Sequence, residues 1–149
     1  MELCLASGTD RAFILDLEQA SFPLDEAATD ESLKLRLIEA PQYFYILKKS
    51  ENIIGFINGT CISGPELHHD SMTTHNPNGS ILVIHSVVIK SNERRKHLGI
   101  RMIHKYISIM KNRKELIEIR LLTKPKFIPL YLMAGFAYNG QSSVVHGQA

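Results

Sequence analysis

One stretch of the chain, from Ile81 to Met110, constrains the fold more than any other. It begins with apolar, mostly β-branched residues as far as Ile89, interrupted only by His85 and Ser86, as expected of a strand buried on both faces. A short polar turn follows. From Leu98 onward, apolar residues recur at the spacing of an amphipathic helix. The stretch therefore predicts a buried strand that passes through a polar turn into a helix.

The predicted turn carries three consecutive cations, Arg94, Arg95 and Lys96. The first backbone N–H groups of a helix have no partner within the helix, and the helix dipole is positive at that end. Together with the cations, these groups predict a binding site for an anion, and a phosphate is the anion that such sites most often bind. The same pattern also fits an ordinary connection from strand to helix whose charges are simply solvated.

The chain has 149 residues, of which 44% are hydrophobic and 21% are charged, as in ordinary globular proteins. This length predicts one domain, residues 1–149, with a single substantial core. The formal net charge of +2 is too small to indicate a nucleic-acid or membrane partner.

The cellular compartment is inferred from three features of the sequence. Cys4 and Cys61 lie in apolar segments, so we interpret them as buried thiols of a protein in a reducing compartment. The first residues lack the charged and apolar regions of a signal peptide. No stretch is apolar over the length of a membrane span. We therefore expect a cytoplasmic protein.

A long irregular segment, residues 63–80, is rich in histidine, asparagine, glycine and proline. Its three histidines, His68, His69 and His75, do not have the spacing of zinc ligands, and no metal is expected. Long loops in compact domains are often functional, and we interpret this one as a solvated loop that covers a substrate.

Apolar spacing, helix caps, and breaks at proline and glycine indicate the remaining elements. The predicted strands are residues 2–6, 43–48, 53–62, 81–89, 116–122 and 136–138, and the predicted helices begin near residues 10, 30, 98 and 125. Gly55 and Gly59 indicate a bulge or close packing within a strand. The unit from 81 to 122 should be right-handed with two parallel strands, and the hairpin before it should add antiparallel strands. We therefore predict an α/β (α+β) domain with a mixed sheet flanked by helices.

Several of these motifs, in this order, resemble a known family. The segments IHSVVI, RRKHLG and IPLYLMAGF resemble the acetyl-CoA-dependent N-acetyltransferases of the GNAT superfamily. Two further segments, FPLDEAATDESLKLRLIEAP and SMTTHNPNGSILVIHSVVI, resemble the arylalkylamine (serotonin) N-acetyltransferases, especially their non-vertebrate, polyamine-acetylating branch. The resemblance extends from about Glu18 to Gly147. It implies the GNAT fold, in which two parallel strands splay apart to form the acetyl-CoA cleft.

The resemblance identifies the turn as the family's phosphate loop, in which Arg94 and Gly99 match and His97 stands at the first glycine position. Glycine there allows close backbone approach to a pyrophosphate. We expect His97 to present its N–H if its backbone keeps an ordinary conformation. An N–H near Val87 is expected to face the thioester oxygen. The residues expected to bind acetyl-CoA are Val87, Val88, Ile89, Arg94, Arg95, Lys96, His97, Leu98, Gly99, Ile100 and Tyr131.

Three residues are catalytic candidates. His85 matches one of two histidines used by the serotonin-acetylating branch, whereas Val83 occupies the position of the other, so no histidine pair is available. Glu26 matches the glutamate assigned as the base in insect relatives. Pattern and resemblance leave open whether His85 or Glu26 takes the proton from the amine. Tyr131 matches the tyrosine that protonates the departing thiolate of coenzyme A.

These features predict an acetyltransferase that moves acetyl from acetyl-CoA directly to a small primary amine, either an arylalkylamine or a polyamine. Three acidic residues, Asp25, Glu26 and Glu66, could hold a second cationic centre, which favours polyamines slightly. Two alternatives remain: an acetyltransferase of protein or peptide amines, and a non-catalytic module that binds acetyl-CoA.

The C-terminal segment departs from the resembled family. It matches through about Gly147 and ends at Ala149, whereas the relatives continue into one more strand. That strand would lie between residues 116–122 and 136–138. We therefore expect either direct pairing of these two segments or self-association as a homodimer through this sheet edge, with a mobile tail from Asn139.

Overall fold

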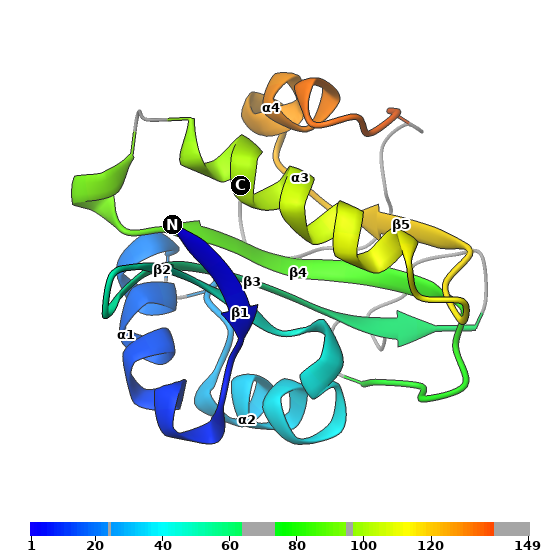
Figure 1. The fold of residues 1–149 in the computed structure, drawn as a ribbon, viewed down its shortest axis with the longest axis horizontal. Coiled ribbons are helices and arrows are strands. Elements are labelled where there is room, and N and C mark those ends of the chain that lie inside the picture. The colour runs from blue at the N-terminus through cyan, green and yellow to red at the C-terminus, as the bar shows by residue number, and fades with distance from the viewer. Residues whose placement is uncertain (24, 64–73, 95–96, 139–149) are drawn as a thin grey trace.

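The computed structural model describes residues 1–23, 25–63, 74–94 and 97–138. Its centre is a five-stranded sheet in the order β1-β2-β3-β4-β5, with α1 and α2 on one face and α3 and α4 on the other (Figure 1). The strands pair in antiparallel fashion except for β4 and β5, which are parallel. The fold class that the sequence predicts, α/β with a mixed sheet flanked by helices, is confirmed.

The strands are β1 (Glu2–Leu5), β2 (Tyr45–Lys49), β3 (Asn52–Ile62), β4 (Ile81–Ile89) and β5 (Glu118–Leu121). The α-helices are α1 (Arg11–Ser21), α2 (Asp30–Glu39), α3 (Leu98–Lys111) and α4 (Ile128–Met133). The described residues also form single turns of 3-10 helix: η1 (Gly8–Asp10), η2 (Pro41–Tyr43), η4 (Ser91–Glu93) and η5 (Pro125–Phe127).

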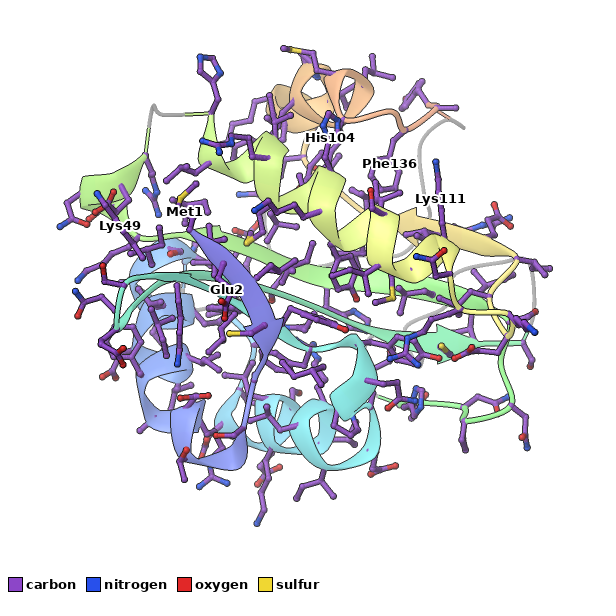
Figure 2. The ribbon with its side chains drawn as sticks, in the orientation of Figure 1. Met1, Glu2, Lys49, His104, Lys111 and Phe136 are labelled. Atoms are coloured by element: carbon purple, nitrogen blue, oxygen red, sulfur yellow. The ribbon has the colours of Figure 1, made fainter. Side chains whose placement is uncertain are left out.

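Local sequence signals set several of these boundaries. Thr29 caps α2, because its hydroxyl oxygen accepts a hydrogen bond of 3.1 Å from the Ser32 N–H. Proline follows that helix at position 41 and starts η2. The predicted hairpin forms between β2 and β3, with Lys49 at the end of β2 (Figure 2). The Lys49 Nζ lies 3.7 Å from the Oε2 of Glu93 in η4.

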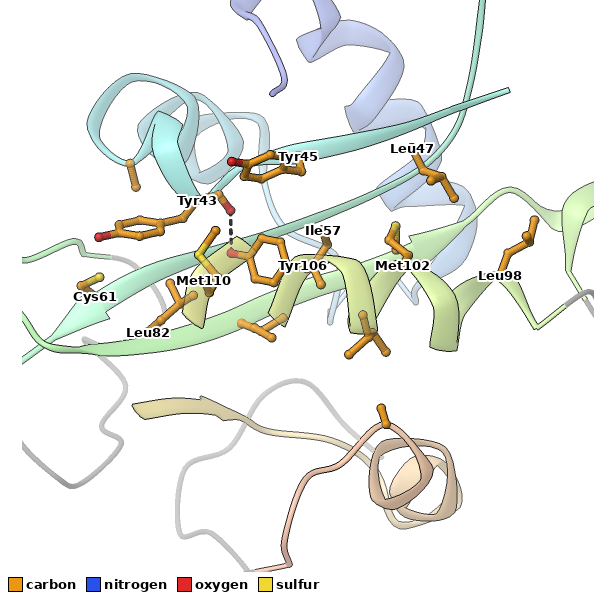
Figure 3. Packing of buried hydrophobic residues seen from close by; sticks show 14 of the residues in the cluster. Tyr43, Tyr45, Leu47, Ile57, Cys61, Leu82, Leu98, Met102, Tyr106 and Met110 are labelled. Carbon is orange, nitrogen blue, oxygen red and sulfur yellow. Dashed lines mark hydrogen bonds between the residues drawn. The ribbon is translucent and has the colours of Figure 1, made fainter. Parts of the chain in front are cut away.

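Each face of the sheet has its own core. On the α3 side, fully buried residues of the helix such as Met102 and Tyr106 pack against β3 and β4 (Figure 3). The Tyr106 hydroxyl donates a hydrogen bond of 2.7 Å to the Tyr43 carbonyl, which satisfies a polar atom inside this core. The other core packs α1 and α2 against the sheet, with Ile14 and Leu33 fully buried.

The predicted strand at residues 136–138 is wrong. Gly135 adopts a φ of +102° and ends α4, after which the Phe136 N–H donates a hydrogen bond of 3.0 Å to the Tyr131 carbonyl. A second bond joins the Gly135 N–H to the Leu132 carbonyl at 3.1 Å, which completes a Schellman cap. The Phe136 N–H is therefore committed to the helix end and is not available for a strand ladder.

Three other predicted strands extend beyond those observed, the first of them by one residue, since β1 ends at Leu5. β5 is shorter than residues 116–122, since the Ile117 N–H bonds to the Ser80 carbonyl at 2.8 Å and the Ile117 side chain is exposed. Tyr43 belongs to η2, so β2 begins at Tyr45. Across the described ranges β5 pairs with β4 alone, so the direct pairing expected at the C-terminal edge is not observed. The segment from residue 139 lies outside the described residues.

Of the described helices, none combines the length and the apolar character needed to cross a membrane.

His75 lies beside the end of β3, where the Cys61 N–H donates a hydrogen bond of 3.0 Å to its Nδ1. Burial lowers the pKa of His75 below its ordinary value of 6.5, although the Glu39 carboxylate opposes the effect. The unfolded chain therefore takes up a proton at this residue before the folded chain does. Stability from this group is fully present above about pH 6.5 and falls as the pH drops towards the lower, folded-state pKa.

We predict that a His75→Asn variant loses this part of the acid sensitivity, because an amide oxygen can accept the Cys61 N–H without titrating. Urea unfolding from about pH 8 to about pH 5 measures the effect. The free energy of unfolding of the wild type should fall more steeply below about pH 6.5 than that of the variant. Equal slopes for the two proteins would rule His75 out as the responsible group.

Candidate active site

The centre of the candidate site is a β-bulge in β4 at His85. Asn58 of β3 pairs with Ser86, but the next residue, Gly59, pairs with Ile84, so His85 is the extra residue. Ile84 and Val87 pack in the α3-side core, whereas Val88 packs in the core on the α1 and α2 side. The bulge therefore places His85 and Ser86 together on the face that α1 and α2 cover.

The parallel pairing of β4 with β5 stops at this bulge. β5 pairs with residues 81–84 of β4, and no described strand continues along that side as far as Ile89. The Lys90 N–H donates a hydrogen bond of 2.7 Å to the Ile54 carbonyl of β3. In an antiparallel pair the backbone groups of successive residues point alternately towards and away from the partner strand, so this bond sets the direction for the residues before Lys90. Val87 and Ile89 consequently direct their N–H and C=O groups away from β3. They form the open edge that the predicted splayed strand pair requires.

Two glycines allow β3 to lie against this part of β4. A Cβ atom at Gly55 or Gly59 would lie 2.5 Å from the carbonyl oxygen of Val88 or Val83, respectively. Any larger residue would push the strands apart next to the bulge. The sequence prediction of close packing at these two glycines is confirmed.

The turn after β4 leads into α3 through a strained residue. His97 is the N-cap of α3 and adopts a left-handed conformation, with φ of 58° and ψ of 21°. The ordinary backbone conformation that was the condition for His97 to present its N–H is therefore not met. Histidine tolerates this region better than most non-glycine residues do, so it can replace the glycine of the resembled motif without abolishing the turn.

The first turn of α3 has free backbone donors. His97 makes no side-chain capping hydrogen bond, and no acidic residue stands in the first turn. The N–H groups of Leu98, Gly99 and Ile100 are therefore the donors that an α-helix leaves without an internal partner. With the positive end of the helix dipole, they suit an anion such as a phosphate.

Gly99 is not required by the packing of the protein itself. A Cβ atom there would meet only the Ile89 side chain, at 4.0 Å, which is ordinary van der Waals contact. The absence of a side chain leaves the backbone of the first helical turn accessible from outside. This is the condition for close approach of a ligand to the helix N-terminus.

Arg94 joins the turn to β4 and α1. Its Nε donates a hydrogen bond of 2.9 Å to the Ile89 carbonyl, and its Nη2 donates one of 3.3 Å to the Ser21 hydroxyl. The side chain therefore anchors the turn, in addition to the phosphate-binding role that the sequence predicts. The neighbouring cations, Arg95 and Lys96, lie outside the described residues.

Buried polar residues surround the bulge on the α1 and α2 face. The His85 Nε2 lies 2.6 Å from the Thr60 hydroxyl. The Ser86 hydroxyl donates a hydrogen bond of 2.7 Å to the carboxylate of Glu18, which is 2% exposed. The other oxygen of Glu18 accepts the Ala28 N–H at 3.0 Å. These bonds hold both bulge residues in place.

Arg36 of α2 extends this polar cluster. Its Nη1 donates a hydrogen bond of 3.2 Å to the Asn58 side-chain oxygen. Burial lowers the pKa of Arg36 to about 10, and the Glu18 carboxylate opposes that shift. Sequence analysis missed Glu18, Arg36 and Asn58. The available signal was Asn58, a polar residue in the middle of the mostly apolar strand β3.

Glu26 lies in the connection between α1 and α2 and is only 5% exposed. The Lys124 ammonium, which follows β5, lies 2.8 Å from its Oε1. This ion pair joins the α1–α2 connection to the segment that links β5 to α4. Asp25 beside it is exposed.

Tyr131 lies within α4, and its ring packs edge-on against Phe136 with centroids 6.0 Å apart. Burial raises the pKa of Tyr131 to about 12. Its hydroxyl therefore remains protonated over the whole neutral range and can act as a proton or hydrogen-bond donor. The Schellman cap after α4 fixes the turn from which this side chain projects.

The structure brings some of the predicted residues together. Val87, Ile89 and the N-terminus of α3 line one continuous strand-to-helix segment, and His85 adjoins it. Glu26 comes from the α1–α2 connection, which its ion pair with Lys124 joins to the segment after β5, and Tyr131 lies further along that segment, in α4. Glu66, His68 and His69 lie outside the described residues. Among the described residues, no group of three metal-ligating side chains could hold a metal ion.

Comparison with known families gives one clear match. The sequence model of the acetyltransferase (GNAT) family matches residues 11–136. No curated protein matches the chain by sequence.

Solved structures with the same fold are distant in sequence. A GNAT-like decarboxylase, GphF, solved with isobutyryl-CoA, superposes with a TM-score of 0.77 at 18% identity, over 92% of this chain and 73% of its own. The aminoglycoside acetyltransferase AAC(6')-Iy, solved with a CoA bisubstrate analogue, superposes with a TM-score of 0.68 at 12% sequence identity. The match covers 99% of this chain and 98% of that one. The diaminobutyrate acetyltransferase EctA from Paenibacillus lautus, solved with L-2,4-diaminobutyric acid and coenzyme A, superposes with a TM-score of 0.61 at 17% sequence identity. The match covers 87% of this chain and 69% of that one.

Gly99 provides a test of the predicted phosphate contact. We predict that Gly99→Ala leaves the fold intact or stabilises α3 by up to about 1 kcal/mol, because alanine favours a helix. The added methyl group should nevertheless weaken acetyl-CoA binding by about tenfold, since it obstructs approach to the backbone. Thermal unfolding and isothermal titration measure the two effects. A variant that binds acetyl-CoA as the wild type does would show that no phosphate lies against Gly99.

Proposed function

Because this chain belongs to the acetyltransferase (GNAT) family, we propose that it transfers an acetyl group from acetyl-CoA to a small primary amine. The observation that carries the proposal is the open edge of β4 next to the uncapped N-terminus of α3. An extended pantetheine arm suits the first feature, and a pyrophosphate suits the second.

The residues present fit acetyl-CoA. The N–H and C=O groups of Val87 and the N–H group of Ile89 can pair with the amide groups of pantetheine, as an added strand would, whereas the Ile89 carbonyl already accepts the Arg94 Nε–H. The N–H groups of Leu98, Gly99 and Ile100 can hold the phosphates. When bound, acetyl-CoA supplies a thioester carbonyl, and the Val87 N–H is the donor that we assign to its oxygen.

The amine nucleophile must lose a proton before it attacks. Alkylamines have pKa values of about 10, so a base must accept that proton near neutral pH. His85 is one candidate, because it occupies the bulge and its ring is held by Thr60. Glu26 is the other, but its carboxylate is paired with Lys124 and has to exchange that partner for the substrate.

We assign proton donation to the departing thiolate to Tyr131. Its raised pKa of about 12 keeps the phenol protonated at the pH of catalysis. The sign of this shift also has a kinetic consequence. Tyr131 loses its proton only near pH 12, so it should add no alkaline limb to the pH–rate profile at lower pH.

The substrate class within small amines rests on charge. Glu26 is a buried carboxylate, which suits an ammonium group, and Asp25 beside it is a second acidic residue. Structural neighbours that act on diamino compounds or aminoglycosides are compatible with a substrate carrying more than one amine. We therefore favour a polyamine over an arylalkylamine.

Isothermal titration with acetyl-CoA, followed by turnover assays with spermidine and tryptamine, tests the proposal. Acetyl-CoA at about a hundredfold excess over its dissociation constant should stabilise the fold by about 3 kcal/mol. Spermidine should be acetylated faster than tryptamine. If acetyl-CoA leaves the unfolding temperature unchanged, the assignment of acetyl-CoA as the acetyl donor is refuted. Binding without turnover of either amine would indicate a non-catalytic module or another class of acceptor.

Two variants divide the base hypothesis. If His85 accepts the proton, His85→Gln should lower turnover by about a hundredfold and remove the acidic limb of the pH–rate profile. Glu26→Gln should then act mainly on the KM for the amine. If Glu26 is the base, Glu26→Gln should instead lower turnover by about a hundredfold and remove the acidic limb, and His85→Gln should act mainly on the KM for the amine. Turnover of both variants close to that of the wild type would mean that bulk water takes the proton.

Tyr131→Phe tests the acid assignment. The hydroxyl should matter only as the thiolate departs, so turnover should fall by about a hundredfold while acetyl-CoA affinity stays unchanged. An acetyl donor with a more acidic thiol should be less sensitive to the substitution. Equal losses of affinity and turnover would indicate that the residue contributes only packing.

A further inference from the structure

The ion pair between Lys124 and Glu26 places a primary amine where the proposed reaction needs one. Lysine head groups normally remain in water, but the Lys124 side chain is 31% exposed and its Nζ lies 2.8 Å from a carboxylate that is almost fully buried. The amine is therefore held in one position by a charge-assisted hydrogen bond. A primary amine is also the group that the proposed function consumes.

The position of Lys124 in the fold brings it close to the bulge. β5 ends at Leu121, which pairs with Ile84, the residue immediately before the bulge at His85. Lys124 follows only three residues later, and three extended residues span about 10 Å. The chain then continues through η5 into α4, which carries Tyr131. The lysine amine, held by Glu26, thus lies on the segment that leaves β5 where its pairing with β4 stops, and Tyr131 follows on the same segment.

We propose that Lys124 is an internal acetyl acceptor, so that the enzyme acetylates its own Nζ when no amine substrate is present. This inference rests on the proposed function. The Lys124 ammonium gives one proton to the Glu26 carboxylate, and its neutral Nζ then attacks the thioester carbonyl carbon of acetyl-CoA. A C–N bond forms, the C–S bond breaks, and the departing thiolate takes a proton from the Tyr131 hydroxyl. The second amine proton passes to solvent, from which Tyr131 regains its own.

The product of this step has a different charge from the reactant. Acetyl-Lys124 carries no positive charge and cannot form an ion pair with Glu26, so once Glu26 has released the accepted proton to solvent, a buried carboxylate is left without a counter-ion. That carboxylate gains most from an incoming ammonium group. Acetylation of Lys124 therefore converts the site from one filled by an internal amine into one that attracts an external amine.

Lys126 is a matched control on the same segment. Its side chain is exposed, and its ammonium lies 5.0 Å from the centroid of the Phe127 ring instead of near a carboxylate. Simple chemical acetylation depends on exposure, so it should favour Lys126. Acetylation within the site should favour Lys124.

The experiment incubates the purified full chain with acetyl-CoA alone and maps acetylated lysines by peptide mass spectrometry. Acetyl-CoA should modify Lys124 about tenfold faster than Lys126, whereas N-hydroxysuccinimide acetate, which needs no binding site, should give the reverse order. The rate at Lys124 should not depend on protein concentration, because the reaction is intramolecular. Lys124→Arg should abolish the main modification but keep the unfolding temperature, since arginine can retain the ion pair with Glu26.

The Glu26→Gln variant shows whether acetylation of Lys124 depends on the ion pair that positions its amine or only on the exposure of that amine. It should slow acetyl-CoA labelling of Lys124 and speed N-hydroxysuccinimide acetate labelling of the same residue, because the ion pair no longer holds the amine. Labelling of Lys126 should not change with either reagent. Acetyl-CoA labelling of Lys124 no faster than that of Lys126, or a rate that rises with protein concentration, would overturn the proposal. Turnover of spermidine by a protein whose Lys124 stays unmodified in acetyl-CoA alone would overturn this inference and leave the proposed function standing.

Discussion

The single extra residue in β4, His85, is the constraint on which the rest of the site depends. Without a bulge, the pairing of β4 with β5 could continue beyond Ile84, and the backbone groups of Val87 and Ile89 would be used within the sheet. The bulge also brings His85 and Ser86 to the same face. One local irregularity therefore creates the open edge on one side of the strand and directs a titratable side chain towards α1 and α2.

A bulge is an irregular pairing, so the surrounding residues have to hold it. The Glu18 carboxylate accepts hydrogen bonds from Ser86 and from the backbone of Ala28, and Thr60 contacts His85. Burial lowers the pKa of Arg36, and the Glu18 carboxylate offsets part of that shift. Removing one member of such a buried, charged set typically destabilises a fold by about 3–5 kcal/mol. The polar cluster is thus the support of the bulge and ties both N-terminal helices to it.

Much of the fold follows from local sequence, because periodicity and caps are local. The bounds of β4 and the first residue of α3 agree with the predicted pattern, and Thr29 caps the helix predicted to begin near residue 30. The error at residues 136–138 arose because Phe136 has the side chain of a strand residue but uses its N–H in a helix cap. The Glu18–Ser86 bond and the Glu26–Lys124 pair join residues far apart in sequence. No single-sequence pattern indicates such pairs, and they are what defines the site beyond its motifs.

Residue-resolved amide hydrogen exchange, with and without acetyl-CoA, tests the central claim most directly. The account predicts that protection rises at Val87 and Ile89, whose N–H groups face the open edge, and at the first turn of α3. Protection at Ser86 and Val88 should stay the same, since these residues already pair with β3. Unchanged exchange at Val87 and Ile89 in the presence of bound acetyl-CoA would contradict the account.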